Sequence, residues 1–243
     1  MNLVARLGAA GCIAADEEAG MLTEAAGGDL DRLESLVRRR EAGEPVEWIV
    51  GWAPFCGLRV VVQRGVYVPR AQTEVLARRA LEVLPARGLA VDLATGSGAV
   101  AVVLAVAGAE VVATEIDPVA AACARANGVT VFEGDLDGPL PATLEGRVDV
   151  LTANVPYVPT HALSLLPRDV QDHEPRLALD GGTGGLDHVR RVLALASRWL
   201  RPATGRVLVE IGPDQAAAFP GLVHHRDEDG DVRAVEAGAG TAG

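Results

Sequence analysis

The sequence predicts an α/β protein whose main part is a doubly wound parallel sheet. Three observations support this class. Short segments rich in Val and Leu alternate with helix-like segments from Leu89 onward, as in sheets whose strands are buried on both faces. A glycine-rich turn, Gly96-Ser97-Gly98, follows the first of these strand-like segments and opens a helix-like one. Apolar residues make up 49% of the 243 residues, which is enough for a large buried core.

The N-terminal part of the chain precedes the alternating region. Residues 1–44 are helix-like and charged, and their large apolar side chains are too few for an independent core, so we expect a small helical lobe. Pro45 then breaks the pattern, and residues 46–62 are rich in Trp, Ile, Val and Phe, which indicates a β-hairpin. We therefore expect residues 45–70 to link the lobe to one large domain, residues 71–243.

The large domain should open with a helix that carries Leu76 and Leu84 and ends at Pro85. The predicted strands are Leu89 to Leu93, Glu110 to Thr114, Val129 to Glu133, Val148 to Ala153 and Arg206 to Ile211. The predicted helices between them are Ala99 to Ala107, Pro118 to Ala126 and Gly185 to Leu200. A final hairpin is predicted from Leu222 to His225 and from Val232 to Glu236, around the turn Asp229-Gly230.

Charge and cysteine usage narrow the class of function. A net charge of -11 and a pI near 4.9 argue against a nucleic-acid partner, which needs a clustered basic face. The longest apolar run, Ala99 to Ala107, is too short for a membrane span. Three widely spaced cysteines predict neither a disulfide framework nor a zinc site, and they fit a cytoplasmic protein. The sequence leaves the oligomeric state open.

We predict no metal site. The residues His225, Asp227, Asp229, Gly230 and Glu236 fall at calcium-loop positions, but His replaces the first Asp and flanking helices are missing. A charged hairpin turn is the better interpretation of this segment. The five histidines show no ligand spacing.

Acidic and glycine residues at the predicted strand ends indicate a nucleoside site, because ligands of doubly wound sheets lie beyond the carboxyl ends of the strands. The turn offers bare backbone, and Glu115 can accept hydrogen bonds from both hydroxyls of a ribose. Asp135 is placed to reach the amino group of an adenine and Leu136 to cover its face. The candidate cofactor-binding residues are Asp92, Thr95, Gly96, Gly98, Glu115, Asp135, Leu136 and Asn154.

The glycine-rich turn alone does not identify the cofactor. The run from Gly96 to Ala101 also satisfies the dinucleotide pattern G-x-G-x-x-A, so it favours an NAD(P)-linked reductase as much as an enzyme that uses S-adenosylmethionine.

The tetrapeptide Asn154-Val155-Pro156-Tyr157, after the fourth predicted strand, favours transfer of a methyl group to nitrogen. An NH2 group that donates to the Asn154 side-chain oxygen and to the Val155 carbonyl is fixed in direction, and its lone pair is exposed. Pro156 stiffens the turn, and Tyr157 can lie against a planar acceptor. An ordinary turn with an Asn cap is the competing interpretation. We assign these four residues as the candidate catalytic residues.

The residues from about Pro45 to Ile211 resemble the HemK/PrmC family of protein-(glutamine-N5) methyltransferases, which modify peptide-chain release factors. The resemblance rests on the turn, the tetrapeptide, Glu115 and five further segments, which are Gly51 to Gly57, Gly65 to Glu74, Gly134 to Leu136, Glu174 to Gly182 and Glu210 to Gly212. It implies a Rossmann-like class I methyltransferase fold, S-adenosylmethionine as cofactor, a release-factor-like protein substrate, and Asn154 as the residue that holds the accepting nitrogen.

Three features leave the acceptor open. The family has a second proline where this chain has Val155, the N-terminal lobe is short, and the segment after Gln215 is abbreviated. A small-molecule amide or amine in a biosynthetic pathway is therefore an alternative acceptor. A reductase, or a binding protein without turnover, is the alternative outside this class.

Overall fold

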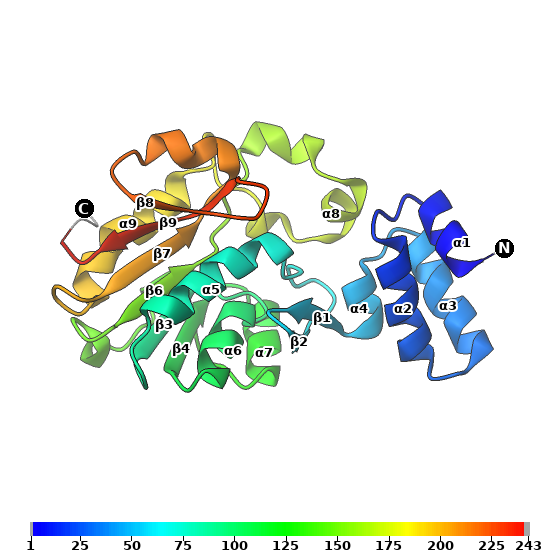
Figure 1. Cartoon of the computed structure of the whole chain (residues 1–243), viewed down its shortest axis with the longest axis horizontal. Coiled ribbons are helices and arrows are strands. Elements are labelled where there is room, and N and C mark those ends of the chain that lie inside the picture. The colour runs from blue at the N-terminus through cyan, green and yellow to red at the C-terminus, as the bar shows by residue number, and fades with distance from the viewer. Residues whose placement is uncertain (1, 241–243) are drawn as a thin grey trace.

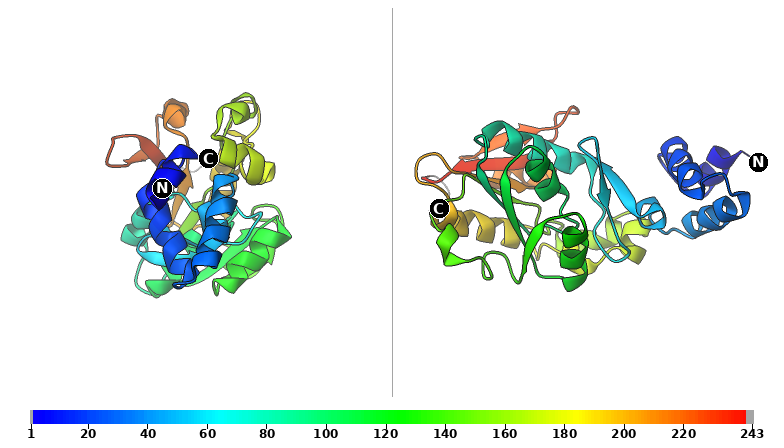
Figure 2. Two further views of the ribbon diagram at one scale, coloured as in Figure 1. Left: turned by 90° about the vertical axis from the view of Figure 1, so that its right-hand side faces the viewer. Right: turned by 90° about the horizontal axis from the view of Figure 1, so that it is seen from below.

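The computed structural model of the chain describes residues 2–240, and its helices and strands form an elongated molecule with the N-terminal helices at one end (Figure 1). The views in Figure 2 show these helices standing apart from the sheet, joined to it through a short helix and a two-stranded hairpin. Within residues 2–240, no helix combines the length and the apolar character that a membrane span needs.

The N-terminal lobe consists of α1 (Leu3–Ala9), α2 (Ala15–Ala26) and α3 (Leu30–Glu41). Side-chain caps begin two of these helices, because Asn2 accepts from the backbone of α1 and Asp29 from that of α3. The buried cluster of the lobe is completed by Val46 and Ile49, which lie beyond residue 44. Small side chains accompany the few large ones in this cluster. Its members are Leu7, Cys12, Ala19, Leu22, Ala26, Leu36, Val37, Val46 and Ile49.

The segment from 46 to 62 is only partly a hairpin, so the prediction for its beginning is wrong. It starts with a helix, α4 (Val46–Val50), which ends at Gly51 with a φ of 86°. The hairpin follows as β1 (Trp52–Phe55) and β2 (Leu58–Val61). Val46 and Ile49 lie on the face of α4 that packs into the lobe, and this packing outweighs the β propensity of their branched side chains.

The main sheet has seven strands in the order β5, β4, β3, β6, β7, β9, β8. Its parallel strands are β3 (Leu89–Leu93), β4 (Glu110–Glu115), β5 (Thr130–Glu133), β6 (Val150–Ala153) and β7 (Arg206–Glu210). An antiparallel edge is added by β8 (Val223–Arg226) and β9 (Val232–Gly238). The sequence order reverses between β3 and β6, which is where a doubly wound sheet opens a cleft.

Helices cover both faces of this sheet. One face carries α5 (Glu74–Val83), α6 (Ala99–Val106) and α7 (Pro118–Ala126), and the other carries α9 (Asp187–Trp199). Alternate residues of the central strands serve the two faces, so that Ala90 packs with α5 and α6 while Val91 packs with α9. The predicted fold class is confirmed, and the predicted strands and helices of this region differ from the observed ones by at most two residues at an end.

Short helical turns that the sequence did not predict lie in the connections. They are η1 (Ala71–Thr73), η2 (Ala142–Leu144), η3 (Thr160–Leu165), α8 (Arg168–His173), η4 (Arg176–Ala178) and η5 (Pro213–Ala218). The segment from η3 to η4 connects β6 to α9 and contributes to the cavity described below.

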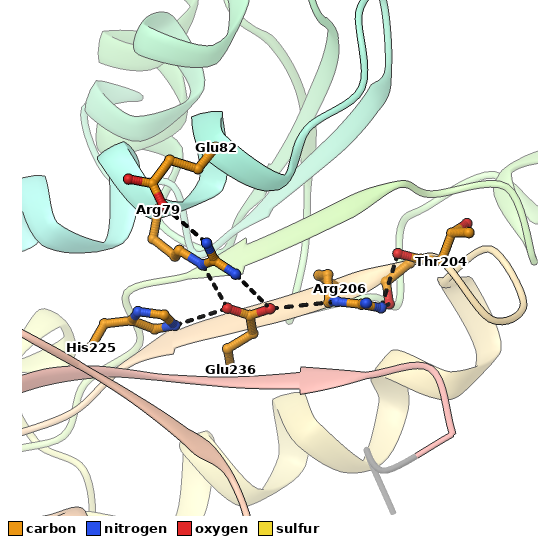
Figure 3. A network of polar contacts seen from close by, with 7 residues as sticks. Arg79, Glu82, Thr204, Arg206, His225 and Glu236 are labelled. Carbon is orange, nitrogen blue, oxygen red and sulfur yellow. Dashed lines mark hydrogen bonds and ion pairs between the residues drawn. The ribbon is translucent and has the colours of Figure 1, made fainter.

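A buried carboxylate ties the antiparallel edge to the rest of the sheet (Figure 3). Glu236 on β9 is 5% exposed, and its oxygens contact Arg79 Nε at 2.8 Å, His225 Nε2 at 2.8 Å and Arg206 Nε at 3.4 Å. Burial alone would raise the pKa of Glu236, but Arg79 and His225 outweigh it, so the pKa lies below its usual value.

We expect Glu236→Gln to lower the free energy of unfolding by about 2 kcal/mol at neutral pH, because it removes the charge that these groups share. A lowered pKa stabilises the folded state above the unfolded value of 4.5, and this contribution is lost as pH falls through the folded pKa. Urea unfolding at pH 7 and near pH 3 measures both effects. Glu82→Gln is the control, because Glu82 also pairs with Arg79 but is 65% exposed. Equal losses in the two variants would contradict this account.

Candidate active site

A cavity of about 650 Å³ opens at the carboxyl ends of β3, β4, β5 and β6. It brings together every predicted site residue except Gly98. Those that line it are Asp92, Thr95, Gly96, Glu115, Asp135, Leu136, Asn154, Val155, Pro156 and Tyr157. The residues thus meet at the place where the sheet topology predicts a ligand.

A buried carboxylate fastens the glycine-rich turn to the neighbouring strand. Asp92, at 2% exposure, accepts from Thr95 Oγ1 at 2.5 Å and from Thr152 Oγ1 on β6 at 2.6 Å. Burial raises the pKa of Asp92 to about 6. Because the two threonines lie on opposite sides of the point where the strand order reverses, Asp92 fixes the turn at the edge of the cavity.

The two glycines of the turn serve different purposes. Gly96 lines the cavity with a φ of 58°, and a Cβ built there would meet no atom within 4 Å. Gly98 lies away from the cavity, and a Cβ on it would come within 3.0 Å of Val129 Cγ2 and 3.1 Å of Ala124 Cβ. Gly96 therefore leaves open space for a ligand, whereas Gly98 allows α6 to begin close to α7.

Glu115 at the end of β4 is held by backbone groups. Its Oε2 accepts from Gly96 N at 2.8 Å and its Oε1 from Asp117 N at 2.9 Å. Burial raises the pKa of this carboxyl, which is 7% exposed. Each oxygen keeps a second acceptor position, and the residue lines the cavity. This arrangement fits the two ribose hydroxyls of a nucleoside.

The residues predicted to hold an adenine are only partly free to do so. Leu136 is buried at the cavity wall with a φ of 45°, but Asp135 Oδ2 accepts from Arg191 Nη2 at 2.7 Å. Sequence reasoning missed Ile116, which lines the cavity beside Glu115 and is 49% exposed. An apolar residue directly after the acidic strand end was the available signal. A side chain this exposed within a cavity wall offers apolar surface to a flat ring.

The Asn154 side chain is oriented by a residue far away in the sequence. Its Nδ2 donates to Thr73 Oγ1 at 3.2 Å, so the Oδ1 atom at the other end of the amide points away from Thr73. Among the groups that the structure describes, none donates to Asn154 Oδ1 or to the Val155 carbonyl oxygen. Two neighbouring residues that line the cavity therefore each keep an acceptor atom without a described donor.

The backbone of this loop is enclosed by a glycine-rich segment whose function the sequence did not reveal. A Cβ on Gly181 would lie 2.7 Å from Pro156 O, and one on Gly185 would collide with the Tyr157 carbonyl. Gln215 Nε2 donates to that carbonyl at 2.8 Å. Glycines at 181 and 185 therefore permit a close approach that fixes the position of the loop.

Tyr157 is anchored through its hydroxyl. The hydroxyl accepts from Gln72 Nε2 at 2.7 Å and donates to Glu210 Oε1 at 3.0 Å. Burial raises the pKa of this phenol well above its usual value. The ring is thus held from its far end, and Tyr157 also lines the cavity.

A buried ion pair positions the outer wall of the cavity. Arg70 pairs with Glu174, whose side chain is 1% exposed, and the Arg70 guanidinium lies 5.3 Å from the centre of the Tyr67 ring. Burial raises the pKa of Glu174 to about 7. The neighbouring residues Pro69 and Pro175 line the cavity, so this pair joins two segments of its wall that are distant in sequence.

A doubly wound sheet with a nucleoside-sized cavity and a polar Asn-Val-Pro-Tyr loop defines an S-adenosylmethionine-dependent methyltransferase. No protein-family model matches the chain. A release factor glutamine methyltransferase from Geobacter sulfurreducens is 40% identical over 202 residues, which cover 80% of this chain and 70% of that protein. The chain belongs to the release factor glutamine methyltransferase family, as the resemblance in its motifs indicated.

The chain is also similar to a relative with a small-molecule substrate in its name and to one solved structure. A 4-amino-L-phenylalanine/4-methylamino-L-phenylalanine methyltransferase from Streptomyces pristinaespiralis is 39% identical over 221 residues, which cover 82% of this chain and 75% of that protein. The solved structure of the E. cuniculi Mtq2–Trm112 complex is 20% identical with a TM-score of 0.49, and the match covers 71% of this chain and 96% of that chain.

Proposed function

We propose that this protein methylates the side-chain amide nitrogen of a glutamine that a protein such as a release factor presents to the cavity. The observation that supports it most is the pair of unused acceptor atoms, Asn154 Oδ1 and the Val155 carbonyl oxygen. A glutamine NH2 has two donors, which match these two acceptors. The relative from Geobacter sulfurreducens carries this activity in its name.

The proposed mechanism follows from how an amide nitrogen reacts. Its lone pair is delocalised into the carbonyl, so it is a poor nucleophile. Asn154 and Val155 fix both N–H bonds and thereby direct the lone pair along one line. Bound S-adenosylmethionine supplies an electrophilic methyl group. Glu115, Gly96 and Leu136 are the residues that would hold its nucleoside part, and no general base is needed before attack.

A small aromatic amine is the second candidate acceptor. The relative from Streptomyces pristinaespiralis acts, by its name, on 4-amino-L-phenylalanine, and its identity to this chain is nearly that of the relative named for release factors. An aromatic NH2 also has two N–H bonds and a delocalised lone pair. The same two oxygens of the loop therefore fit it.

The proposed domain organisation consists of an N-terminal lobe (1–44), a linker (45–70) and a methyltransferase domain (71–243). The buried cluster that α4 shares with the lobe supports it, because this cluster contains no residue of the main sheet, and an ion pair of Arg59 with Glu24 joins the hairpin to α2. We also propose a cytoplasmic location, which agrees with the free thiols of Cys12, Cys56 and Cys123.

The acceptor can be identified with methyl-labelled S-adenosylmethionine. The purified protein is incubated separately with the release factors of its source, with 4-amino-L-phenylalanine, and with lysate separated into macromolecular and small-molecule fractions. We expect label in the macromolecular fraction and, by mass spectrometry, on a glutamine of a release factor. Label confined to small molecules would reject the glutamine proposal and favour the amine.

A further inference from the structure

Glu210 lies at the centre of a buried polar group behind the Asn154 loop. It is fully buried on β7, and its Oε1 accepts from the Tyr157 hydroxyl at 3.0 Å and from Gln72 Nε2 at 3.4 Å. Gln72 also donates to the Tyr157 oxygen at 2.7 Å, so the tyrosine proton is directed at Glu210. These donors all point toward the carboxylate, which accepts hydrogen bonds and donates none when it is ionised.

Thr73 lies between this carboxylate and Asn154. It is 4% exposed, and its Oγ1 accepts from Asn154 Nδ2 at 3.2 Å. Burial raises the pKa of Glu210, whereas the Thr73 hydroxyl, the Tyr157 hydroxyl and Gln72 favour its charged form. Within the described residues, Glu210 Oε2 has no hydrogen bond of ordinary geometry. A hydroxyl has a single proton. When that proton faces Glu210, only lone pairs of Thr73 face Asn154.

The direction of these bonds decides which end of the Asn154 amide enters the cavity. An amide can turn by half a rotation and exchange its oxygen and its NH2 with little change of shape. A hydroxyl that only accepts binds the NH2 end and leaves Oδ1 for the acceptor. If the amide turned over, its NH2 would face the NH2 of the acceptor, and the two donors would repel each other.

We propose that Thr73, with its proton directed at Glu210, is a positioning residue that keeps the Asn154 oxygen facing the methyl acceptor. This inference rests on the proposed function, since it assumes an acceptor with an NH2 group, but it applies to a glutamine amide and to an aromatic amine alike. It assigns Glu210 a place in the same chain of hydrogen bonds, one step further from the acceptor.

The test compares turnover in three threonine variants at saturating cofactor. Thr73→Val keeps the shape but loses the acceptor, and we expect kcat to fall roughly tenfold or more with an unchanged affinity for S-adenosylhomocysteine. Thr73→Ser keeps the hydroxyl and should restore most of the rate. Thr114→Val is the control, because Thr114 is buried as well, but it lies on β4 outside the cavity, and its hydroxyl has no partner among the described residues.

Two further measurements separate positioning from a general structural effect. If Thr73 acts through Asn154, then Thr73→Val should change the residual rate of Asn154→Ala less than twofold. Glu210→Gln, whose NH2 can donate to Thr73, should slow the reaction as Thr73→Val does. The inference would be overturned if Thr73→Val lowered the rate of Asn154→Ala by as much as it lowers the rate of the unchanged protein. A normal rate in Thr73→Val alone would also overturn it.

The orientation can also be followed without any acceptor. Hydrogen exchange of the Asn154 side-chain NH2, observed by nitrogen-15 NMR, should become roughly tenfold faster in Thr73→Val, because one N–H loses its partner. Unchanged exchange would overturn the inference, whatever the protein methylates. Failure to methylate either a glutamine or an aromatic amine would instead reject the proposed function.

Discussion

Replacing Asn154 by Ala is expected to lower turnover on the order of a hundredfold, with little change in the affinity for S-adenosylhomocysteine. The side chain projects from the loop after β6, and its oxygen is one of two acceptors left unused at the cavity wall. Its contact matters mainly while the nitrogen attacks, when the two N–H bonds must be held so that the lone pair points at the methyl group. The loss should therefore appear in kcat rather than in cofactor binding.

Single-turnover rates with labelled S-adenosylmethionine, together with calorimetry of S-adenosylhomocysteine binding, measure the two quantities separately. Asn127→Ala is a useful control. The Asn127 amide donates to the backbone of Val61 and Ser97 and lies outside the cavity, so its loss should lower the melting temperature while turnover per folded molecule is retained. The assignment of Asn154 would be wrong if its removal weakened cofactor binding but left turnover at saturating cofactor normal.

Local composition was sufficient to predict the sheet. The central strands β3, β6 and β7 are buried almost throughout, so each appears in the sequence as a short run rich in Val, Leu or Ala, and β3 and α7 begin and end where predicted. The acidic residue Glu115 and the Asn154 loop could be placed because a parallel sheet brings the ends of its strands to one edge.

The contacts that hold the site together could not be predicted in this way, because they join residues that are distant in sequence. Gln72 meets Glu210, and the glycine at 185 packs against the carbonyl of Tyr157. Nothing in the sequence near either member of these pairs names its partner. Asp135 shows the same limit, because its position after β5 was predicted but its bond to Arg191 on α9 depends on how the two elements pack.

The beginning of the linker, residues 46–50, was mispredicted for a related reason. Val46 and Ile49 are branched residues that favour strands, but they face the lobe cluster and are part of α4. Tertiary packing decides such short apolar segments, since periodicity over five residues cannot separate a helix from a strand.

Replacing Glu115 by Ala is expected to weaken S-adenosylhomocysteine binding by about 2 kcal/mol, or roughly thirtyfold, because a charged acceptor for two hydroxyls is lost. The carboxylate also accepts from Gly96 N and Asp117 N, so its removal leaves the turn less well held as well. Calorimetry measures the change. Glu133→Ala is the matched control, because Glu133 ends the neighbouring strand β5, pairs with Arg125 and lies outside the cavity.

The same experiment tests the cofactor against the reductase alternative. A ligand that binds the folded protein raises its melting temperature, so S-adenosylhomocysteine should stabilise the protein while NAD should not. In Glu115→Ala this stabilisation should shrink, whereas in Glu133→Ala it should stay as in the unchanged protein. Equal stabilisation by NAD would contradict S-adenosylmethionine as the cofactor, because a dinucleotide would then bind at the same turn and at Glu115. An unchanged affinity in Glu115→Ala would show that the ribose hydroxyls bind elsewhere in the cavity.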